Sequence, residues 1–295
     1  AEFNAGDYQA AVEANVEAET ISRVLYPNDK SENGKELRLK QQYFLASASL
    51  QDILRRWTSK HGGDFSGFAA KTAMQLNDTH PTISVAELMR ILMDEHALGW
   101  DEAWAITARV MSYTNHTLLP EALEKWPLAM LKKLVPRLVD IIFEINARFL
   151  RTVANKWPGD TGRQARMSII EDGPHAQVRM ANLACVGSHA INGVAALHTE
   201  LLKKTVLRDF YELFPEKFHN VTNGVTPRRW LALCNPELTK LITSRLGGGW
   251  LSHLETSLGW LQGAASDTTF QRKWLKVKQA NKESLAKVIL ERTGI

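Results

Sequence analysis

Cysteine is scarce in this chain of 295 residues, since Cys185 and Cys234 are the only two. One pair at most cannot form a disulfide framework, and such usage fits a reducing compartment. Long apolar runs are also missing, because none approaches the ~20 residues that a membrane helix requires. The first seven residues contain neither a basic nor an apolar stretch, so no secretory signal is expected. These absences predict a cytoplasmic protein that makes no contact with a membrane.

A strong charge of one sign is absent as well. Lys and Arg number 36, Asp and Glu number 32, and the two signs are interspersed along the chain. A nucleic-acid surface needs clustered basic residues and stacking aromatic rings, and the sequence shows neither. The charge pattern therefore predicts a mixed-charge surface and no nucleic-acid partner.

Several well-known catalytic and metal-binding motifs are missing. The glycines at 247–249 lack the G-x-G-x-x-G spacing, and Gly187-Ser188-His189 lacks the spacing of a nucleophile elbow. Cys185 and His189 lie four residues apart but supply fewer than the three or four ligands of a zinc site, so we expect a buried structural pair and no metal. A glycosidase carboxylate pair cannot be identified, because that separation is a tertiary property.

What the chain does have is an alternation of strand-like and helical segments. Apolar residues at three- and four-residue steps predict helices over 35–60, 85–92 and 137–156, and short strand-like runs occupy 72–77, 110–113 and 218–222. The apolar run at 180–186 fits a strand or a helix equally well. The last 65 or so residues look wholly helical. This order predicts an α/β fold.

Capping residues predict where several helices begin. Asp101 is the expected N-cap of one helix, and Pro120 should open the first turn of another. Thr226 and Pro227 predict a third start, with threonine at the N-cap and proline at the first helical position.

Three short polar turns follow strand-like runs and precede helical ones. They are Leu76-Asn77-Asp78-Thr79-His80-Pro81, Tyr113-Thr114-Asn115-His116-Thr117 and Thr222-Asn223-Gly224-Val225-Thr226-Pro227-Arg228-Arg229-Trp230. Ligands of open α/β sheets bind beyond the carboxyl ends of the strands, where such turns would converge. Asn, Asp and neutral His suit sugar hydroxyls, and helix N-termini suit phosphate. Helix capping alone explains the same residues, so both interpretations stay open at this point.

Five stretches make the chain resemble the α-glucan phosphorylase family, which covers glycogen, starch and maltodextrin phosphorylases. They are residues 21–29 (ISRVLYPND), 75–81 (QLNDTHP), 113–117 (YTNHT), 187–190 (GSHA) and 222–230 (TNGVTPRRW). Family members are far longer, and the chain matches their middle. The resemblance implies the glycosyltransferase B fold, in which residues 1–223 form the later part of a first Rossmann-like domain and residues 224–295 the opening helices of a second.

The resemblance also implies an activity. The family transfers glucosyl units from the non-reducing ends of α-1,4-glucan to phosphate, with retention of configuration, and uses pyridoxal 5′-phosphate. Family members are expected to form homodimers. The cofactor lysine of the family lies downstream of Ile295, so we expect the 295 residues alone to be inactive. The alternative is a non-catalytic glucan-binding or assembly module that reuses the fold.

Site residues follow from the same resemblance. It implies that His116 contacts the glucosyl unit, that Asn223 hydrogen-bonds sugar hydroxyls and that Trp230 lies beside the cofactor. Burial in a core is the competing role for Trp230.

Four more residues are implied to lie near the pocket. Asp78 and His80 match residues that line it, while Asn28 and Asp29 match the mobile loop that gates it. Packing and capping are the competing roles of Asp78 and His80. Lys30 stands where many relatives have Asn, and this added cation would change the charge of the loop.

Overall fold

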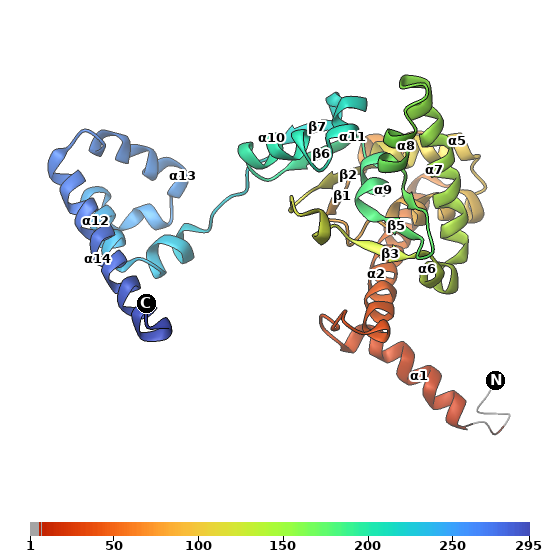
Figure 1. Ribbon diagram of the computed structural model, residues 1–295, viewed down its shortest axis with the longest axis horizontal. Coiled ribbons are helices and arrows are strands. Elements are labelled where there is room, and N and C mark those ends of the chain that lie inside the picture. Colours follow the sequence, from red (N-terminus) through yellow and green to blue (C-terminus); the bar gives the residue numbers. More distant parts are fainter. Residues whose placement is uncertain (1–5, 7) are drawn as a thin grey trace. The chain divides into compact units, whose positions relative to one another are not determined.

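The computed structural model describes residue 6 and residues 8–295, apart from the side chains of residues 10, 11 and 255. The seven-residue start, which we expect to lack a secretory signal, lies outside the described residues except for residue 6. The chain divides into two compact units, Ala1–Thr222 and Asn223–Ile295 (Figure 1). Each unit is described by itself. Their identity as two Rossmann-like domains stays a prediction.

The first unit is built on a four-stranded parallel sheet with the order β1-β2-β6-β7. Its strands are β1 (Met74–Asn77), β2 (Met111–Thr114), β6 (Ala190–Gly193) and β7 (Phe218–Asn220). Leu76, Tyr113, Ile191 and Phe218 lie side by side in the register, and all four are buried. The α/β fold that the sequence predicts is therefore confirmed, and the structure shows that its four-stranded sheet is parallel.

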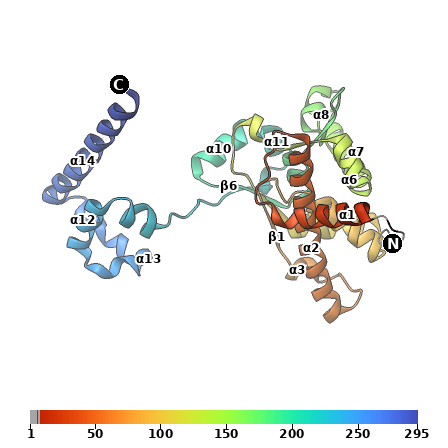
Figure 2. The same cartoon turned by 90° about the horizontal axis from the view of Figure 1, so that it is seen from below.

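Helices precede and connect these strands (Figure 2). They are α1 (Tyr8–Arg23), α2 (Glu32–His61), α3 (Phe68–Lys71), α4 (Ser84–Arg90), the π-helical turn Ile91–Glu95, α5 (Trp100–Val110), α6 (Leu128–Leu134), α7 (Pro136–Lys156), α8 (Thr161–Met167), α9 (Met180–Gly187), α10 (Ala196–Lys204), α11 (Arg208–Leu213) and the 3-10 turn Pro215–Lys217. A small antiparallel sheet with the order β3-β5-β4 lies beside them, made of β3 (Lys125–Pro127), β4 (Ile170–Glu171) and β5 (Gln177–Arg179). Among the described residues, every helix is too short or too polar to cross a membrane.

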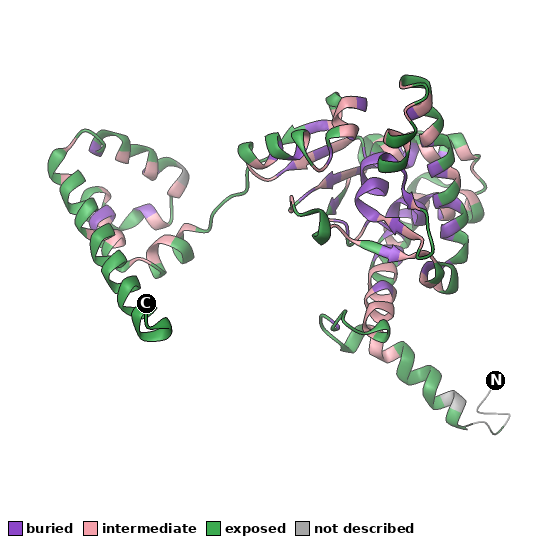
Figure 3. Ribbon diagram, viewed as in Figure 1, coloured by how far each residue is buried: buried purple, intermediate pink, exposed green. Residues whose placement is uncertain are grey.

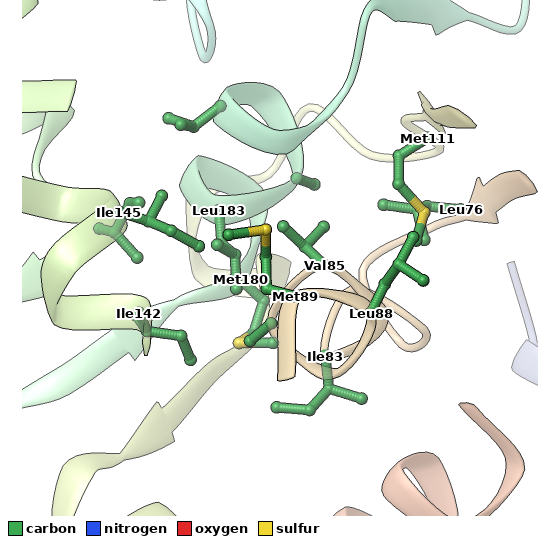
Figure 4. Close-up of a cluster of buried hydrophobic side chains, with 14 of the residues drawn as sticks. Leu76, Ile83, Val85, Leu88, Met89, Met111, Ile142, Ile145, Met180 and Leu183 are labelled. Carbon is green, nitrogen blue, oxygen red and sulfur yellow. The ribbon is translucent and has the colours of Figure 1, made fainter. Parts of the chain in front are cut away.

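The core of this unit forms where α4 meets the sheet and two other helices. Figure 4 shows α4 side chains between Ile142 and Ile145 of α7 on one side and Leu76 and Met111 of the sheet on the other. Every residue of α9 is buried. A helix that is apolar all round has no amphipathic period, and for this reason the sequence could not distinguish a helix from a strand over 180–186.

Local signals explain several helix ends. Ser31 caps α2 by accepting a hydrogen bond from the Gly34 N–H at 3.1 Å. The predicted helix over 137–156 is confirmed, and it begins one residue earlier at a proline. The predicted cap Asp101 is wrong, since Gly99 is the N-cap and Asp101 lies in the first turn, where a carboxylate favours the helix dipole. Pro120 opens only the 3-10 turn Pro120–Ala122, because the chain then enters β3.

The second unit is helical, as the sequence predicts. Its helices are the π-helix Arg228–Leu233, α12 (Pro236–Leu246), the 3-10 turn Gly248–Leu251, α13 (Leu254–Ser257), the 3-10 helix Leu258–Ala264 and α14 (Thr268–Thr293). The helix start predicted at Thr226 is shifted, since Pro227 is the N-cap. Trp250 is buried, whereas α14 carries no buried residue and is drawn as exposed in Figure 3.

Candidate functional site

Polar side chains link three strands of the parallel sheet near their carboxyl ends. Ser112 Oγ donates to Gln75 Oε1 at 2.6 Å, and Gln75 Nε2 donates to Thr114 Oγ1 at 2.8 Å. Thr114 Oγ1 in turn donates to Asn192 Oδ1 at 2.8 Å. Alternate residues of a strand point to opposite faces, so these groups lie on the face opposite the buried row. The network fixes the direction of each amide and hydroxyl at this edge.

His116 lies directly beyond β2, with its side chain exposed. Its Nε2 is 2.6 Å from Oδ1 of Asn77, the last residue of β1. An amide oxygen only accepts, so His116 Nε2 is the donor in this contact. The preceding Asn115 is buried, and its Nδ2 donates to the Tyr113 hydroxyl at 3.1 Å. The predicted polar turns after β1 and β2 are therefore in contact, and hydrogen bonds of the neighbouring Asn115 hold the turn that carries His116.

Asp78 follows β1 in the left-handed region, with a φ of 68° that Asp tolerates better than most residues. Its backbone N–H donates to Thr114 O at 3.0 Å, which continues the pairing of β1 with β2. Its Oδ1 accepts the Thr79 N–H at 2.6 Å. One carboxylate oxygen of Asp78 thus stabilises the turn itself, as the capping interpretation expects.

His80 lines a cleft of about 450 Å³ together with Asp29, Arg38 and Glu124. Arg38 Nη1 lies 3.4 Å from Asp29 Oδ2. Glu124 Oε2 accepts from Gln42 Nε2 at 2.9 Å, whereas Oε1 is buried and has no hydrogen-bond partner among the described residues. Burial raises the pKa of the Glu124 carboxyl. The cleft offers fixed donors, acceptors and both signs of charge, which suits a polyhydroxylated ligand.

The loop that carries Asn28 and Asp29 rests on the first turn of α2. Asn28 Oδ1 accepts the Lys30 N–H at 3.0 Å. A Cβ added to Gly34 would lie 1.7 Å from the Asn28 carbonyl oxygen, so the loop and helix approach this closely only because residue 34 is glycine. Asn28, Asp29 and Lys30 are all exposed. The structure places the loop beside the cleft, and its gating role stays a prediction.

Asn223 and Trp230 belong to the second unit. Asn223 is its first residue and is exposed. Trp230 lies in the π-helix Arg228–Leu233 and is 63% exposed, so the core role considered for it is wrong. The other predicted site residues, Asn28, Asp29, Asp78, His80 and His116, belong to the first unit.

The sequence analysis missed a group of residues at the carboxyl end of β6. The Val194 N–H donates to His198 Nδ1 at 3.1 Å, and Thr199 Oγ1 donates to Asn220 Oδ1 at 2.8 Å. A Cβ on Gly193 would lie 2.4 Å from Thr199 Oγ1 and 2.7 Å from His198 Nδ1. Helix α10 therefore packs directly on the end of β6. A glycine between a strand and a helix was the signal that could have revealed this contact.

The expected buried pair of Cys185 and His189 is wrong. Cys185 is fully buried in α9, but that helix ends at Gly187 and His189 is exposed. Complete burial raises the pKa of the Cys185 thiol to about 12. The described residues contain no group of three or more His, Cys, Asp or Glu side chains placed to hold a metal ion.

The fold and the site together define a class of protein. Parallel strands alternate with helices, and hydrogen-bonding side chains of neighbouring strands lie together near the carboxyl ends of these strands. Open α/β proteins bind small ligands at this edge. The first unit is therefore an open α/β unit whose polar groups beyond the strands are of the kind that suits hydroxylated molecules.

Comparison with known proteins agrees with this class. The model of the carbohydrate phosphorylases matches residues 1–295, so the chain belongs to the carbohydrate phosphorylase family, as its resemblance predicted. It is 54% identical over 293 residues to a glycogen phosphorylase of Synechocystis sp., covering 99% of the chain and 34% of that protein. It is 53% identical to the human muscle form (97% of the chain, 35% of that protein) and 54% identical to the mouse brain form (95% and 34%). The chain spans about a third of the length of these relatives.

Proposed function

We propose that this chain is the middle part of a glycogen or related α-1,4-glucan phosphorylase. The whole enzyme would transfer glucosyl units from non-reducing glucan ends to phosphate, with retention, and release glucose 1-phosphate. The observation that carries the proposal is the match of the family model to the whole chain. The parent would have the glycosyltransferase B fold, with residues 1–223 and 224–295 in its two Rossmann-like domains, and would act as a cytoplasmic homodimer.

In this proposal the carboxyl edge of the sheet binds the terminal glucosyl unit. His116 contacts the sugar, supported by its bond to Asn77 and by its exposure. Asp78 and His80 line the same region, and Asn223 supplies a further hydrogen bond to sugar hydroxyls in the parent protein. These residues offer donors and acceptors together, which is what hydroxyl groups require.

The loop at Asn28 and Asp29 is proposed to control entry to this region. Its support is the cleft that Asp29 lines together with His80. Lys30 lies exposed beside Asp29 and would attract phosphate towards the entrance.

Pyridoxal 5′-phosphate is proposed as the cofactor of the parent. When bound, it would supply a phosphate that acts in proton transfer. A lysine amine has to hold this aldehyde, and Lys217 is the lysine whose pKa burial lowers. Lys217 does not fit, because it directly precedes β7 and so lies at the amino edge of the sheet, and its Nζ donates to the Cys185 carbonyl at 3.2 Å. Trp230, proposed to lie beside the cofactor, is the contact this chain would contribute.

Two assays on the purified chain test the proposal. Incubation with maltoheptaose and phosphate should release no glucose 1-phosphate, and detection of that product would refute the inactivity of the isolated chain. Calorimetric titration with maltoheptaose should show binding that His116→Ala weakens by about tenfold. The control is His175→Ala, because His175 is exposed in the segment between β4 and β5. Equal affinity of both variants would contradict the role of His116.

A longer coding sequence from the source would extend the test. A full-length product that binds pyridoxal 5′-phosphate and releases glucose 1-phosphate would support the transferase. A full-length product that binds glucan without turnover would favour the binding or assembly module instead.

A further inference from the structure

A pocket of about 230 Å³ in the first unit shares no residue with the candidate site. Its walls come from α5, α7, the end of α9 and the chain around the 3-10 turn Pro215–Lys217. Four of the lining side chains are aromatic, namely Trp100, Trp104, Phe149 and Phe214. An apolar cavity of about 150 Å³ is enough to hold a benzene ring, so this pocket has room for a ring with one substituent.

The charged side chains that line the pocket are both cations, Arg148 and Lys217. Arg148 already has two carboxylate partners, because it donates to Glu144 at 2.7 Å and to Asp101 at 2.8 Å. Its guanidinium also lies 4.8 Å from the centroid of the Trp100 ring. Lys217 is therefore the charge of this pocket that a ligand can use.

The contacts of Lys217 within the described part of the chain include no ion pair with a carboxylate. Its Nζ donates to the Cys185 carbonyl at 3.2 Å and lies 4.4 Å from the centroid of the Phe214 ring. An ammonium has three N–H donors, so a single hydrogen bond leaves donors over. Burial lowers the pKa of this amine, although Cys185 and Glu216 act in the opposite direction. A buried cation of this kind is stabilised by an anion beside it.

Capping of α9 is the structural role that Lys217 already has. Cys185 lies near the end of that helix, where a lysine that donates to a free carbonyl is favourable. This contact needs only one of the three N–H groups. It also holds Nζ beside Phe214, which is one of the aromatic walls of the pocket. The cap therefore accounts for the position of the amine but leaves its charge without an anion.

We propose that this pocket binds a small aromatic carboxylate. The ring packs among the aromatic side chains, and the carboxylate accepts a charge-assisted hydrogen bond from Lys217 Nζ. A carboxylate supplies the anion that Lys217 lacks, and a planar ring matches the aromatic walls. Lys217 directly precedes β7, so the site belongs to the amino end of that strand. The inference does not depend on the proposed function.

NMR titration of the wild-type chain with benzoate and with benzamide tests the proposal without any substitution. The two molecules have nearly the same shape, but only benzoate carries a negative charge. The chain should bind benzoate about tenfold more tightly than benzamide, because only the carboxylate pairs with the ammonium. Equal affinity for the two molecules, or no binding of benzoate, overturns the inference.

Lys217→Met locates the charge that is responsible. Methionine keeps an unbranched apolar side chain and removes the ammonium, so benzoate affinity should fall about tenfold while benzamide affinity stays within about threefold. Lys203→Met is the matched control, because Lys203 also lies over a ring, 5.3 Å from that of Tyr211, but pairs with Glu200 at 3.1 Å and does not line the pocket. Unchanged benzoate affinity of Lys217→Met overturns the inference.

Ala108→Leu covers the case in which Lys217→Met fails to fold. Ala108 lines the pocket and is half-buried in α5, so a leucine there occupies the space of the ring and leaves the charge in place. Binding of benzoate and of benzamide should both weaken by about tenfold. Ala105→Leu makes the same change at an exposed position of the same helix and should retain binding. Undiminished benzoate binding by the folded Ala108→Leu chain overturns the inference.

Discussion

Replacing Gly193 by alanine should destabilise the first unit at its candidate site. The new Cβ would lie 2.4 Å from Thr199 Oγ1, 2.7 Å from His198 Nδ1 and 2.9 Å from Thr199 Cα. One of these neighbours is backbone, and the His198 ring is held by the Val194 N–H. They cannot swing aside as the end of a long side chain would, so the start of α10 has to move away from β6.

The expected magnitude follows from the contacts that this movement disturbs. Overpacking of a tight site costs about 1–3 kcal/mol. The movement also stretches the bond from Thr199 Oγ1 to Asn220 Oδ1 at 2.8 Å and the bond from Val194 to His198 at 3.1 Å. Each bond contributes about 1 kcal/mol. Because the effects share the same atoms, we expect the free energy of unfolding to fall by about 3 kcal/mol.

Thermal unfolding followed by circular dichroism measures this loss. For a unit of this size, the melting temperature should fall by about 6–12 °C. Gly63→Ala is the matched control, because a Cβ there meets no atom within 4 Å. If Gly193→Ala melts within about 1 °C of the wild type while remaining folded, the close approach of α10 to β6 is refuted.

Three further predictions concern buried and paired groups. Glu87→Ala should lower the free energy of unfolding in urea by about 3 kcal/mol, because the fully buried carboxylate accepts from Arg90 at 2.8 and 2.9 Å. The Arg90 guanidinium would then be left with the exposed Glu95 carboxylate, and an unchanged urea midpoint would contradict this prediction. Burial raises the pKa of Cys185 to about 12, whereas Cys234 is exposed, so a thiol reagent in mildly alkaline buffer should modify one cysteine in the native chain and two in urea. Rapid modification of both native thiols would show that α9 opens readily. Hydrogen bonds from two arginine partners lower the pKa of Glu212, so its contribution to stability is complete above its ordinary value of 4.5 and is lost as the pH falls through the lower folded value. Glu212→Gln should therefore flatten the acid decline of the unfolding free energy, and an equally steep decline would count against the pairing.

The parts of the fold that the sequence predicts are those with a strong local pattern. Helix α7 has an apolar face of several turns and a proline at its start, and both features are local. The antiparallel sheet was missed because its strands have two or three residues, too few for an alternating pattern. Its pairing of Lys125 with Arg179 joins segments far apart in the sequence, which no local pattern records.

The site shows the same division between local and tertiary information. The polar turn that contains His116 was predicted because a polar turn after a strand is a local pattern, whereas the role of His116 came from the resemblance to a family. The bond of His116 to Asn77 follows from the parallel pairing of β1 with β2. Glu124 was missed because its burial and its bond to Gln42 depend on a residue 82 positions away. The position of His198 was missed because it depends on the approach of α10 to β6, which is also a tertiary contact.

The buried polar groups of the core and of the sheet edge differ in what they leave unpaired. In the core, Asn146 Oδ1 accepts the Ile169 N–H at 2.8 Å, and its Nδ2 donates to Ser168 Oγ at 3.2 Å. Both polar atoms of this amide therefore have a hydrogen-bond partner. Beyond the carboxyl end of β6, His198 Nδ1 accepts the Val194 N–H, whereas its buried Nε2 has no hydrogen-bond partner among the described residues. A polar group that only stabilises the fold gains nothing from a missing partner, since burial without a partner is unfavourable. The stability of the fold therefore accounts for the paired amide of Asn146 but not for the unpaired Nε2 of His198.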